Sequence, residues 1–94
     1  MKTVVITGAS RGIGLATTKK FLAERWRVIG TYLNTPIPIE NPNLISIQYD
    51  QSDSLSIANF ADQVASTTPQ VDALVNNAGI ALDADEKVAN PIKI

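Results

Sequence analysis

The chain has 94 residues, which is one small domain at most. Its eight basic and nine acidic residues give a net charge of −1. The basic residues form no block, which argues against a nucleic-acid-binding surface. No apolar run approaches the ~20 residues that a membrane span needs, so we expect no membrane partner. The absence of cysteine and histidine excludes disulfides and thiolate metal sites, removes the commonest general base, and leads us to expect no metal site.

The first element is the apolar, β-branched run from Val4 to Ile6, which is typical of a strand buried on both faces. This run is too short for a signal peptide, so the sequence predicts a cytoplasmic protein. A glycine-rich segment follows at residues 8–14, and residues 13–24 favour a helix with Leu15, Phe21 and Leu22 available for its buried face.

The next segment joins two predicted strands without a helix between them. The turn after the first helix, residues 25–27, contains no glycine, so that helix must end without its usual cap. Residues 27–32 read as the second strand and residues 44–49 as the third. Three prolines at residues 36–42 forbid a regular helix between them and predict an extended loop that lies along the surface.

The last part of the pattern is a helix and a strand. Ser52 or Asp53 can cap the helix, whose apolar residues carry the clearest amphipathic spacing in the chain. These residues are Ile57, Phe60, Ala61 and Val64. A fourth strand, residues 73–75, then runs into two asparagines, and the acidic residues of the tail are typical of a solvated surface.

The alternation of strands and helices predicts an α/β fold, a partial Rossmann-like doubly wound parallel sheet. About four strands are expected, in the spatial order 3-2-1-4. Residues 1–80 would form the N-terminal part of a dinucleotide-binding domain, and residues 81–94 a tail of uncertain structure.

The glycine turn directly follows a strand and opens a helix, which is the context of a phosphate-binding loop. A pyrophosphate can sit against the free amides at a helix N-terminus, provided that no side chain holds it away. We assign Gly8 to the tight turn, Gly12 to the close approach of the phosphate and Gly14 to helix–strand packing. The alternative is a turn that contains three glycines by chance.

Two motifs carry a resemblance to a known family. The segment TGASRGIG, residues 7–14, has the spacing Gly-x-x-x-Gly-x-Gly, and DALVNNAG, residues 72–79, places Asn-Asn-Ala-Gly after the fourth strand. Both resemble the signatures of the short-chain dehydrogenase/reductase family, in particular its classical branch with the β-ketoacyl-carrier-protein reductases. The resemblance runs from residue 3 to about residue 80 and would cover only the first third or so of a complete member.

The resemblance implies an NADP(H)-dependent oxidoreductase that transfers hydride between nicotinamide and a carbonyl or alcohol group of a small molecule. By the same resemblance, Asp50 and Gln51 should lie by the adenine, and the residues after Asn76 should line the ribose and nicotinamide. The cofactor-binding residues expected in all are Gly8, Ser10, Arg11, Gly12, Ile13, Gly14, Tyr32, Asp50, Gln51, Asn77, Ala78 and Gly79. Asp50 has the alternative of capping the following helix, and Asn76 that of tying neighbouring strands together.

Two observations decide between the nicotinamide cofactors. An acid after the second strand selects NAD, but residues 30–34 hold no carboxylate and Tyr32 takes its place. Arg11 lies inside the glycine turn, where a guanidinium can bind a 2′-phosphate bidentately. NADP is therefore expected, with NAD possible. Tyr32 either stacks near the adenosine or is a strand-end aromatic, and Arg11 has the alternative of a surface residue without a ligand.

The residues that would perform the chemistry are absent from the chain. The family uses a tyrosine followed four residues later by a lysine, whereas Tyr32 is followed by Pro36 and Tyr49 by Asp53. We therefore assign no catalytic residue and expect the chain alone to be inactive. The alternatives are a non-catalytic dinucleotide-binding or regulatory module, and a remnant whose role, if any, is structural.

The fourth strand would form an unpaired sheet edge that carries Leu74 and Val75. An open apolar edge invites pairing with another chain, so the sequence predicts self-association through this edge.

Overall fold

The structure is a computed structural model, and its described part is residues 1–77. Its elements are β1 (Thr3–Thr7), α1 (Gly12–Ala23), β2 (Arg27–Tyr32), β3 (Leu44–Gln48), α2 (Ser54–Thr67) and β4 (Ala73–Asn76). The predicted tail at residues 81–94 lies outside the described part. None of the helices within residues 1–77 has the length and apolar character that crossing a membrane requires.

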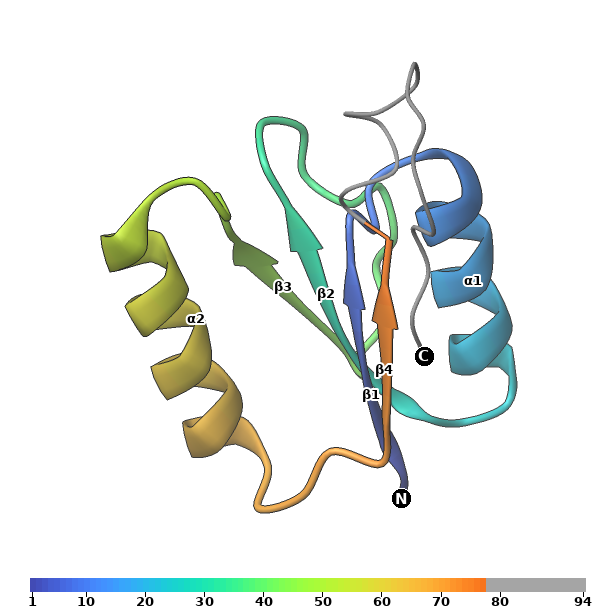
Figure 1. The fold of residues 1–94 in the computed structure, drawn as a ribbon. Coiled ribbons are helices and arrows are strands. Elements are labelled where there is room, and N and C mark those ends of the chain that lie inside the picture. The colour runs from blue at the N-terminus through green and yellow to red at the C-terminus, as the bar shows by residue number, and fades with distance from the viewer. Residues whose placement is uncertain (78–94) are drawn as a thin grey trace.

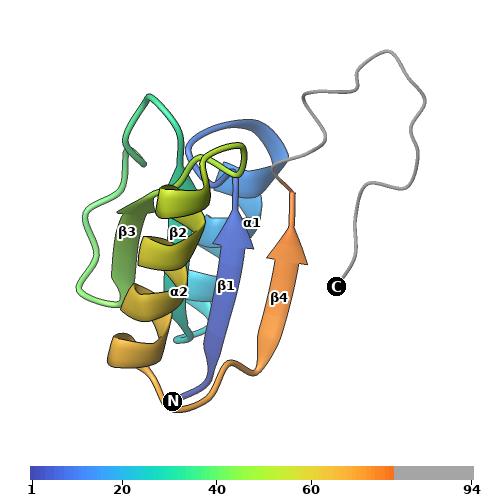
Figure 2. The same cartoon turned by 60° about the vertical axis from the view of Figure 1, so that its left-hand side comes forward.

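The four strands form one parallel sheet in the order β3-β2-β1-β4, which confirms the predicted fold class and strand order. The helix α1 lies on one face of the sheet and α2 on the other (Figures 1 and 2). Because all strands run the same way, the carboxyl ends of β1, β2, β3 and β4 lie together at one end of the sheet. This end is where doubly wound folds bind their ligands.

Alternate residues of each strand build two apolar layers, because successive side chains point to opposite faces. Val4 and Ile6 of β1 pack toward α1 together with Val28 of β2 and Leu22 of α1. On the other face, Val5 packs with Ile29 and Ile47 against partly buried residues of α2. The predicted strand β1 is buried at every position, as its apolar sequence indicates.

The proline-rich connection between β2 and β3 contains no helix, as predicted, but it contributes to the core. Ile37 is only 7% exposed and joins the layer on the α1 face. Gly30 of β2 makes this possible, because a Cβ atom at Gly30 would lie 2.8 Å from Cδ1 of Ile37. The loop therefore follows the surface while one of its side chains takes the place of a packed helix.

The end of α1 shows how a helix can stop without glycine. Arg25 adopts a left-handed conformation with φ of 67°, a position that glycine usually occupies. The N–H of Trp26 donates to the Phe21 carbonyl at 3.1 Å, and the N–H of Arg25 to the Leu22 carbonyl at 3.0 Å. The rings of Phe21 and Trp26 meet edge to face, 4.8 Å between centroids. Together these contacts form a Schellman motif with its hydrophobic pair, and they stabilise the strained arginine.

Candidate dinucleotide-binding site

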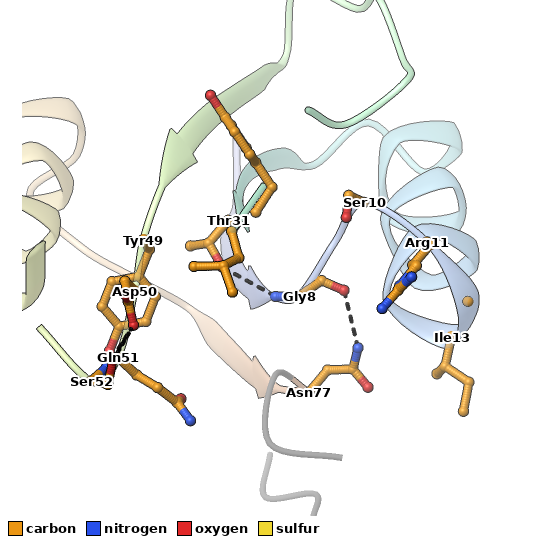
Figure 3. A pocket seen from close by; sticks show the side chains of 13 residues that line it. Gly8, Ser10, Arg11, Ile13, Thr31, Tyr49, Asp50, Gln51, Ser52 and Asn77 are labelled. Atoms are coloured by element: carbon orange, nitrogen blue, oxygen red, sulfur yellow. Dashed lines mark hydrogen bonds between the residues drawn. The ribbon is translucent and has the colours of Figure 1, made fainter. Parts of the chain in front are cut away.

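A pocket of about 610 Å³ opens at the edge of the sheet where the strands end (Figure 3). It is lined by Gly8, Ser10, Arg11, Gly12, Ile13, Thr31, Tyr32, Leu33, Tyr49, Asp50, Gln51, Ser52 and Asn77. Nine of the twelve residues predicted from the sequence lie in this set. Gly14 is buried behind the pocket, and Ala78 and Gly79 lie outside the described residues.

The glycine turn has the conformation that its three glycines allow. Gly8 and Gly12 adopt positive φ angles of 66° and 58°, which L side chains rarely tolerate. A Cβ atom at Gly12 would meet nothing within 4 Å, so the backbone there is open to a ligand. A Cβ atom at Gly14 would overlap the Gly8 carbonyl oxygen and lie 2.6 Å from Nδ2 of Asn77. The turn can therefore pack on α1 only because position 14 lacks a side chain.

The N-terminus of α1 points its free amides into this pocket. The capping residue Arg11 makes no side-chain hydrogen bond to the helix, and the first turn holds no acidic residue. Among residues 1–77, no acceptor takes the backbone N–H groups of Gly12, Ile13 or Gly14. Unpaired amides and the positive end of the helix dipole together favour an anion.

Side chains from both neighbouring strands hold the turn that leads into α1. The Gly8 N–H donates to Oγ1 of Thr31 at 3.1 Å, and the Ala9 N–H donates to the Thr31 carbonyl at 2.8 Å. From the residue directly after β4, Nδ2 of Asn77 donates to the Gly8 carbonyl at 3.1 Å (Figure 3). Thr31 was not among the predicted site residues, because its hydroxyl reaches Gly8 only through the pairing of β1 with β2.

The two asparagines at the end of β4 have different roles: Asn76 is its last residue and Asn77 follows it. Oδ1 of Asn76 accepts a hydrogen bond from the Thr7 hydroxyl at 3.1 Å, which confirms the interpretation that Asn76 ties neighbouring strands together. Asn77 is 9% exposed, and its Oδ1 atom has no hydrogen-bond partner among the described residues. A buried acceptor without a donor costs free energy. The side-chain oxygen Oδ1 of Asn77 is therefore suited to accept a hydrogen bond from a ligand or a water molecule.

The opposite wall of the pocket is the turn between β3 and α2 (Figure 3). The Asp50 carboxylate accepts the backbone N–H of Ser52 at 2.9 Å and its hydroxyl at 2.6 Å. The hydrogen bond from the Ser52 hydroxyl, and to a smaller extent the one from the Ser52 backbone N–H, hold the pKa of Asp50 below its ordinary value. Asp50 therefore stays charged at neutral pH and offers an acceptor to a ligand.

The alternative in which Asp50 caps α2 is wrong. Asp53 is the capping residue, and its carboxylate accepts the Leu55 N–H at 3.0 Å. Asp50 is instead fixed by Ser52 and by the Ser56 hydroxyl, which accepts the Asp50 N–H at 2.8 Å. Because Asp53 caps the helix, the Asp50 carboxylate has no capping role and lies at the wall of the pocket.

Tyr49 and Leu33 are further pocket residues that the sequence did not single out. The Tyr49 ring lies 4.5 Å from the Phe60 ring of α2 and separates the pocket from the helix behind it. Leu33 is 50% exposed at the end of β2, next to Tyr32. An apolar spacing pattern would identify both only as strand-end residues.

Residues 1–77 contain no cluster of side chains suited to a metal ion.

Comparisons with known proteins agree with this geometry. A sequence model described as short chain dehydrogenase matches residues 2–92. The chain is 36% identical over 99% of its length to an uncharacterized oxidoreductase of Bacillus subtilis, covering 37% of that protein. It is 32% identical over 88% of its length to a 3-oxoacyl-[acyl-carrier-protein] reductase of Mycobacterium avium, covering 31% of it.

A solved structure extends the comparison to three dimensions. A 4-hydroxyisoleucine dehydrogenase complexed with NADH superimposes with a TM-score of 0.75 and 34% identity. The match covers 85% of this chain and 35% of that protein. The chain therefore spans about a third of the length of the proteins it resembles.

Proposed function

Because the chain belongs to the short-chain dehydrogenase family, we propose that it is the dinucleotide-binding part of an NADP(H)-dependent oxidoreductase. One observation carries this proposal: the glycine turn directs the uncapped N-terminus of α1 into a pocket at the ends of the strands. Such an amide-lined end matches the pyrophosphate of a dinucleotide in charge and in hydrogen-bonding capacity.

Each wall of the pocket suits one part of the cofactor. The amides of Gly12 and Ile13 would bind the pyrophosphate, with Ser10 beside them. Asp50 and Gln51 would bind the adenine side. The free Oδ1 of Asn77 would accept from a ribose hydroxyl, and Ala78 and Gly79 would continue this wall. When bound, the nicotinamide supplies the hydride that reduces a carbonyl group or accepts one from an alcohol.

Arg11 supports a preference for NADP. Its side chain is exposed at the pocket and makes no ion pair with any acid among residues 1–77. The end of β2 presents Tyr32 and Leu33 in place of the carboxylate that would bind an unmodified ribose and repel a 2′-phosphate.

Calorimetric titration of the unmodified chain, called the parent below, with NADP⁺ and NAD⁺ tests the cofactor assignment. We expect Arg11→Ala to weaken NADP⁺ binding by about tenfold or more, because a charge-assisted hydrogen bond is lost. Binding of NAD⁺ should change by less than about twofold, since NAD⁺ lacks the 2′-phosphate. Equal losses for both cofactors would contradict the assigned role of Arg11, and absence of binding by the parent would contradict the proposed function.

The proposal includes no catalytic residue in this chain. Neither Tyr32 nor Tyr49 has a lysine four residues later, and Tyr49 is packed against Phe60. We expect the purified chain to show no NADPH-dependent carbonyl reduction. Turnover that follows the protein through purification would contradict this expectation.

A second candidate is a module that binds a dinucleotide without chemistry. The intact mass of the protein from its native source separates the two. A mass more than twice the 10.1 kDa of this chain would support the oxidoreductase, and a mass of 10.1 kDa the binding module. A small carbonyl or alcohol substrate is proposed only for the longer protein.

We also propose that the protein lies in the cytoplasm, because its sequence contains no cysteine for disulfide bonds.

We also propose self-association through the outer edge of β4. Within residues 1–77, β4 pairs with β1 alone, and the β4 residue Leu74 is 47% exposed. The unpaired N–H and C=O groups of such an edge can pair with a second copy. Light scattering of the purified chain should give a mass that rises with concentration. A single monomeric mass at millimolar concentration would exclude this contact.

A further inference from the structure

The glycine turn is held from the neighbouring strand β2 by one buried side chain, that of Thr31. Thr31 is 2% exposed, and it makes two hydrogen bonds that continue the pairing of β1 and β2 beyond the end of β1. Its Oγ1 accepts the Gly8 N–H at 3.1 Å, and its carbonyl accepts the Ala9 N–H at 2.8 Å. The turn therefore starts from two amides that are already satisfied within the protein.

The Thr31 contacts separate the amides of the turn into two groups. Those of Gly8 and Ala9 face β2 and are occupied, whereas those of Gly12 and Ile13 have no acceptor among residues 1–77. A backbone amide that already donates within the protein contributes nothing to an anion. Thr31 thus fixes where the occupied segment ends and the phosphate-facing segment begins.

Gly8 is the residue on which Thr31 acts, and its neighbours leave it little room. Its φ of 66° is left-handed, and its carbonyl accepts a hydrogen bond of 3.1 Å from Nδ2 of Asn77, the residue after β4. The Cα of Gly14 approaches the same carbonyl so closely that no Cβ fits there. Gly8 is therefore held by Thr31 of β2, by Asn77 after β4 and by the start of α1, and the contact to its N–H is the one that depends on a side-chain hydroxyl.

We propose that Thr31 is a positioning residue for the pyrophosphate: its hydroxyl fixes the Gly8 peptide and, through it, the direction of the free amides at the start of α1. This inference rests on the proposed function. It differs from a direct contact with the cofactor, because Oγ1 is engaged by Gly8. It also predicts that the effect of Thr31 is confined to ligands that carry the pyrophosphate.

The test compares two ligands and three variants by calorimetric titration. Thr31→Val keeps the shape and removes the acceptor, so NADP⁺ should bind about three- to tenfold more weakly, as expected for one lost hydrogen bond. Adenosine 2′-monophosphate lacks the pyrophosphate, and its binding should change by less than about twofold. Thr31→Ser keeps the hydroxyl and should restore NADP⁺ binding to within about twofold.

The matched control is Thr18→Val, which removes another fully buried threonine hydroxyl. Oγ1 of Thr18 donates to the Gly14 carbonyl at 2.8 Å inside α1 and does not touch the Gly8 peptide. This variant should bind NADP⁺ within about twofold of the parent. Equal weakening of both ligands by Thr31→Val, or NADP⁺ binding unchanged by it, would overturn the role of Thr31. Failure of Thr31→Ser to restore binding would do the same.

Amide hydrogen exchange of the ligand-free chain tests the hydrogen bond from Gly8 to Thr31, on which the inference depends, separately from dinucleotide binding. Thr31→Val should speed exchange of the Gly8 amide by about tenfold, while the amides of Val5 and Ile29 in the sheet keep their protection. Unchanged Gly8 exchange would overturn the inference. Should the valine variant lose the protection of Val5, Thr31→Cys gives the same measurement, because a thiol is a weak acceptor of similar size.

Discussion

The two helices of this protein cover opposite faces of one sheet in different ways. The helix α1 buries Gly14, Thr18 and Leu22, whereas α2 buries none of its residues. Ile57 of α2 remains 44% exposed although the amphipathic pattern assigns it to the buried face. The better sequence pattern therefore belongs to the less buried helix. Small residues bring a helix close to a sheet, and a pattern that counts only large apolar residues overlooks them.

The two halves of the described chain also differ in charge. Residues 1–32, which include α1, hold six basic residues and one acidic residue, a net charge of +5. Residues 33–77, which include α2, hold five acidic residues and no basic one, a net charge of −5. The nearly neutral total hides this separation. Of these basic residues only Arg11 lines the pocket, where its positive charge lies beside the free amides of α1 and attracts an anionic ligand.

An apolar groove lies between α2 and the sheet beside β4. Phe60 and Val64 line it from the helix, and Val5 and Leu74 from the strands. The helix α2 packs mainly against β3 and leaves this side of the sheet open, so α2 is held by fewer contacts than α1. Mutations should therefore have larger effects in the α1 layer, and the following predictions measure that difference.

The largest effect is expected at Gly14. We expect Gly14→Ala to destabilise the chain by at least about 3 kcal/mol and to abolish dinucleotide binding, because the new Cβ overlaps the backbone of Gly8. Gly12→Ala is the matched control, since nothing lies within 4 Å and only the positive φ is strained, at a cost of about 1 kcal/mol. Urea unfolding measures both variants. Equal costs would contradict the close packing of α1.

The second prediction compares one aliphatic residue from each helix. Leu22→Ala in α1 should cost about 2–3 kcal/mol, because its side chain is 9% exposed and its removal leaves a cavity. Ile57→Ala in α2 should cost about 1 kcal/mol or less, because water already reaches the side chain. Thermal and urea unfolding give the two values. A cost at Ile57 that equals the cost at Leu22 would show that α2 is covered in solution, by a second copy or by another segment.

A smaller effect of opposite sign is expected at the end of α1. Arg25→Gly should stabilise the chain by about 0.5–1 kcal/mol, because glycine adopts the positive φ of 67° without strain. Glu24→Gly, one residue earlier at φ of −96°, has no strain to relieve and should be neutral or destabilising. Denaturant midpoints distinguish the two variants. Loss of stability in Arg25→Gly would mean that the arginine side chain makes a contribution larger than the strain.

The smallest effect concerns the α2 side of the pocket. Ser52→Ala removes the hydroxyl that donates to Asp50, so the pKa of Asp50 should rise toward its ordinary value. A depressed carboxyl pKa stabilises the fold above the unfolded-state value of about 3.9 and loses this effect as the pH falls through the folded value. The parent and the variant should therefore differ in pH dependence only in acid. A carboxyl titration by nuclear magnetic resonance measures the shift, and an unchanged Asp50 pKa would contradict the assigned hydrogen bond.

Much of the fold could be predicted because it depends on local pattern. The apolar run of β1, the spacing of α2 and the prolines after β2 each determine the structure of their own segment, and the crossover rule then gives the strand order. The glycine spacing located the phosphate-facing turn for the same reason. Leu15 and Phe21 were expected to share the buried face of α1 with Leu22, but they are only partly buried.

The remaining features depend on contacts between segments distant in the sequence. Ile37 enters the core because Gly30 leaves space for it, and Thr31 reaches Gly8 only through the register of two paired strands. The sequence by itself determined the elements, their order and the glycine turn, because short-range sterics and hydrophobic spacing decide these. Only the tertiary structure decided which side chains hold that turn in place, since a hydrogen bond across strands requires atoms that folding alone brings together.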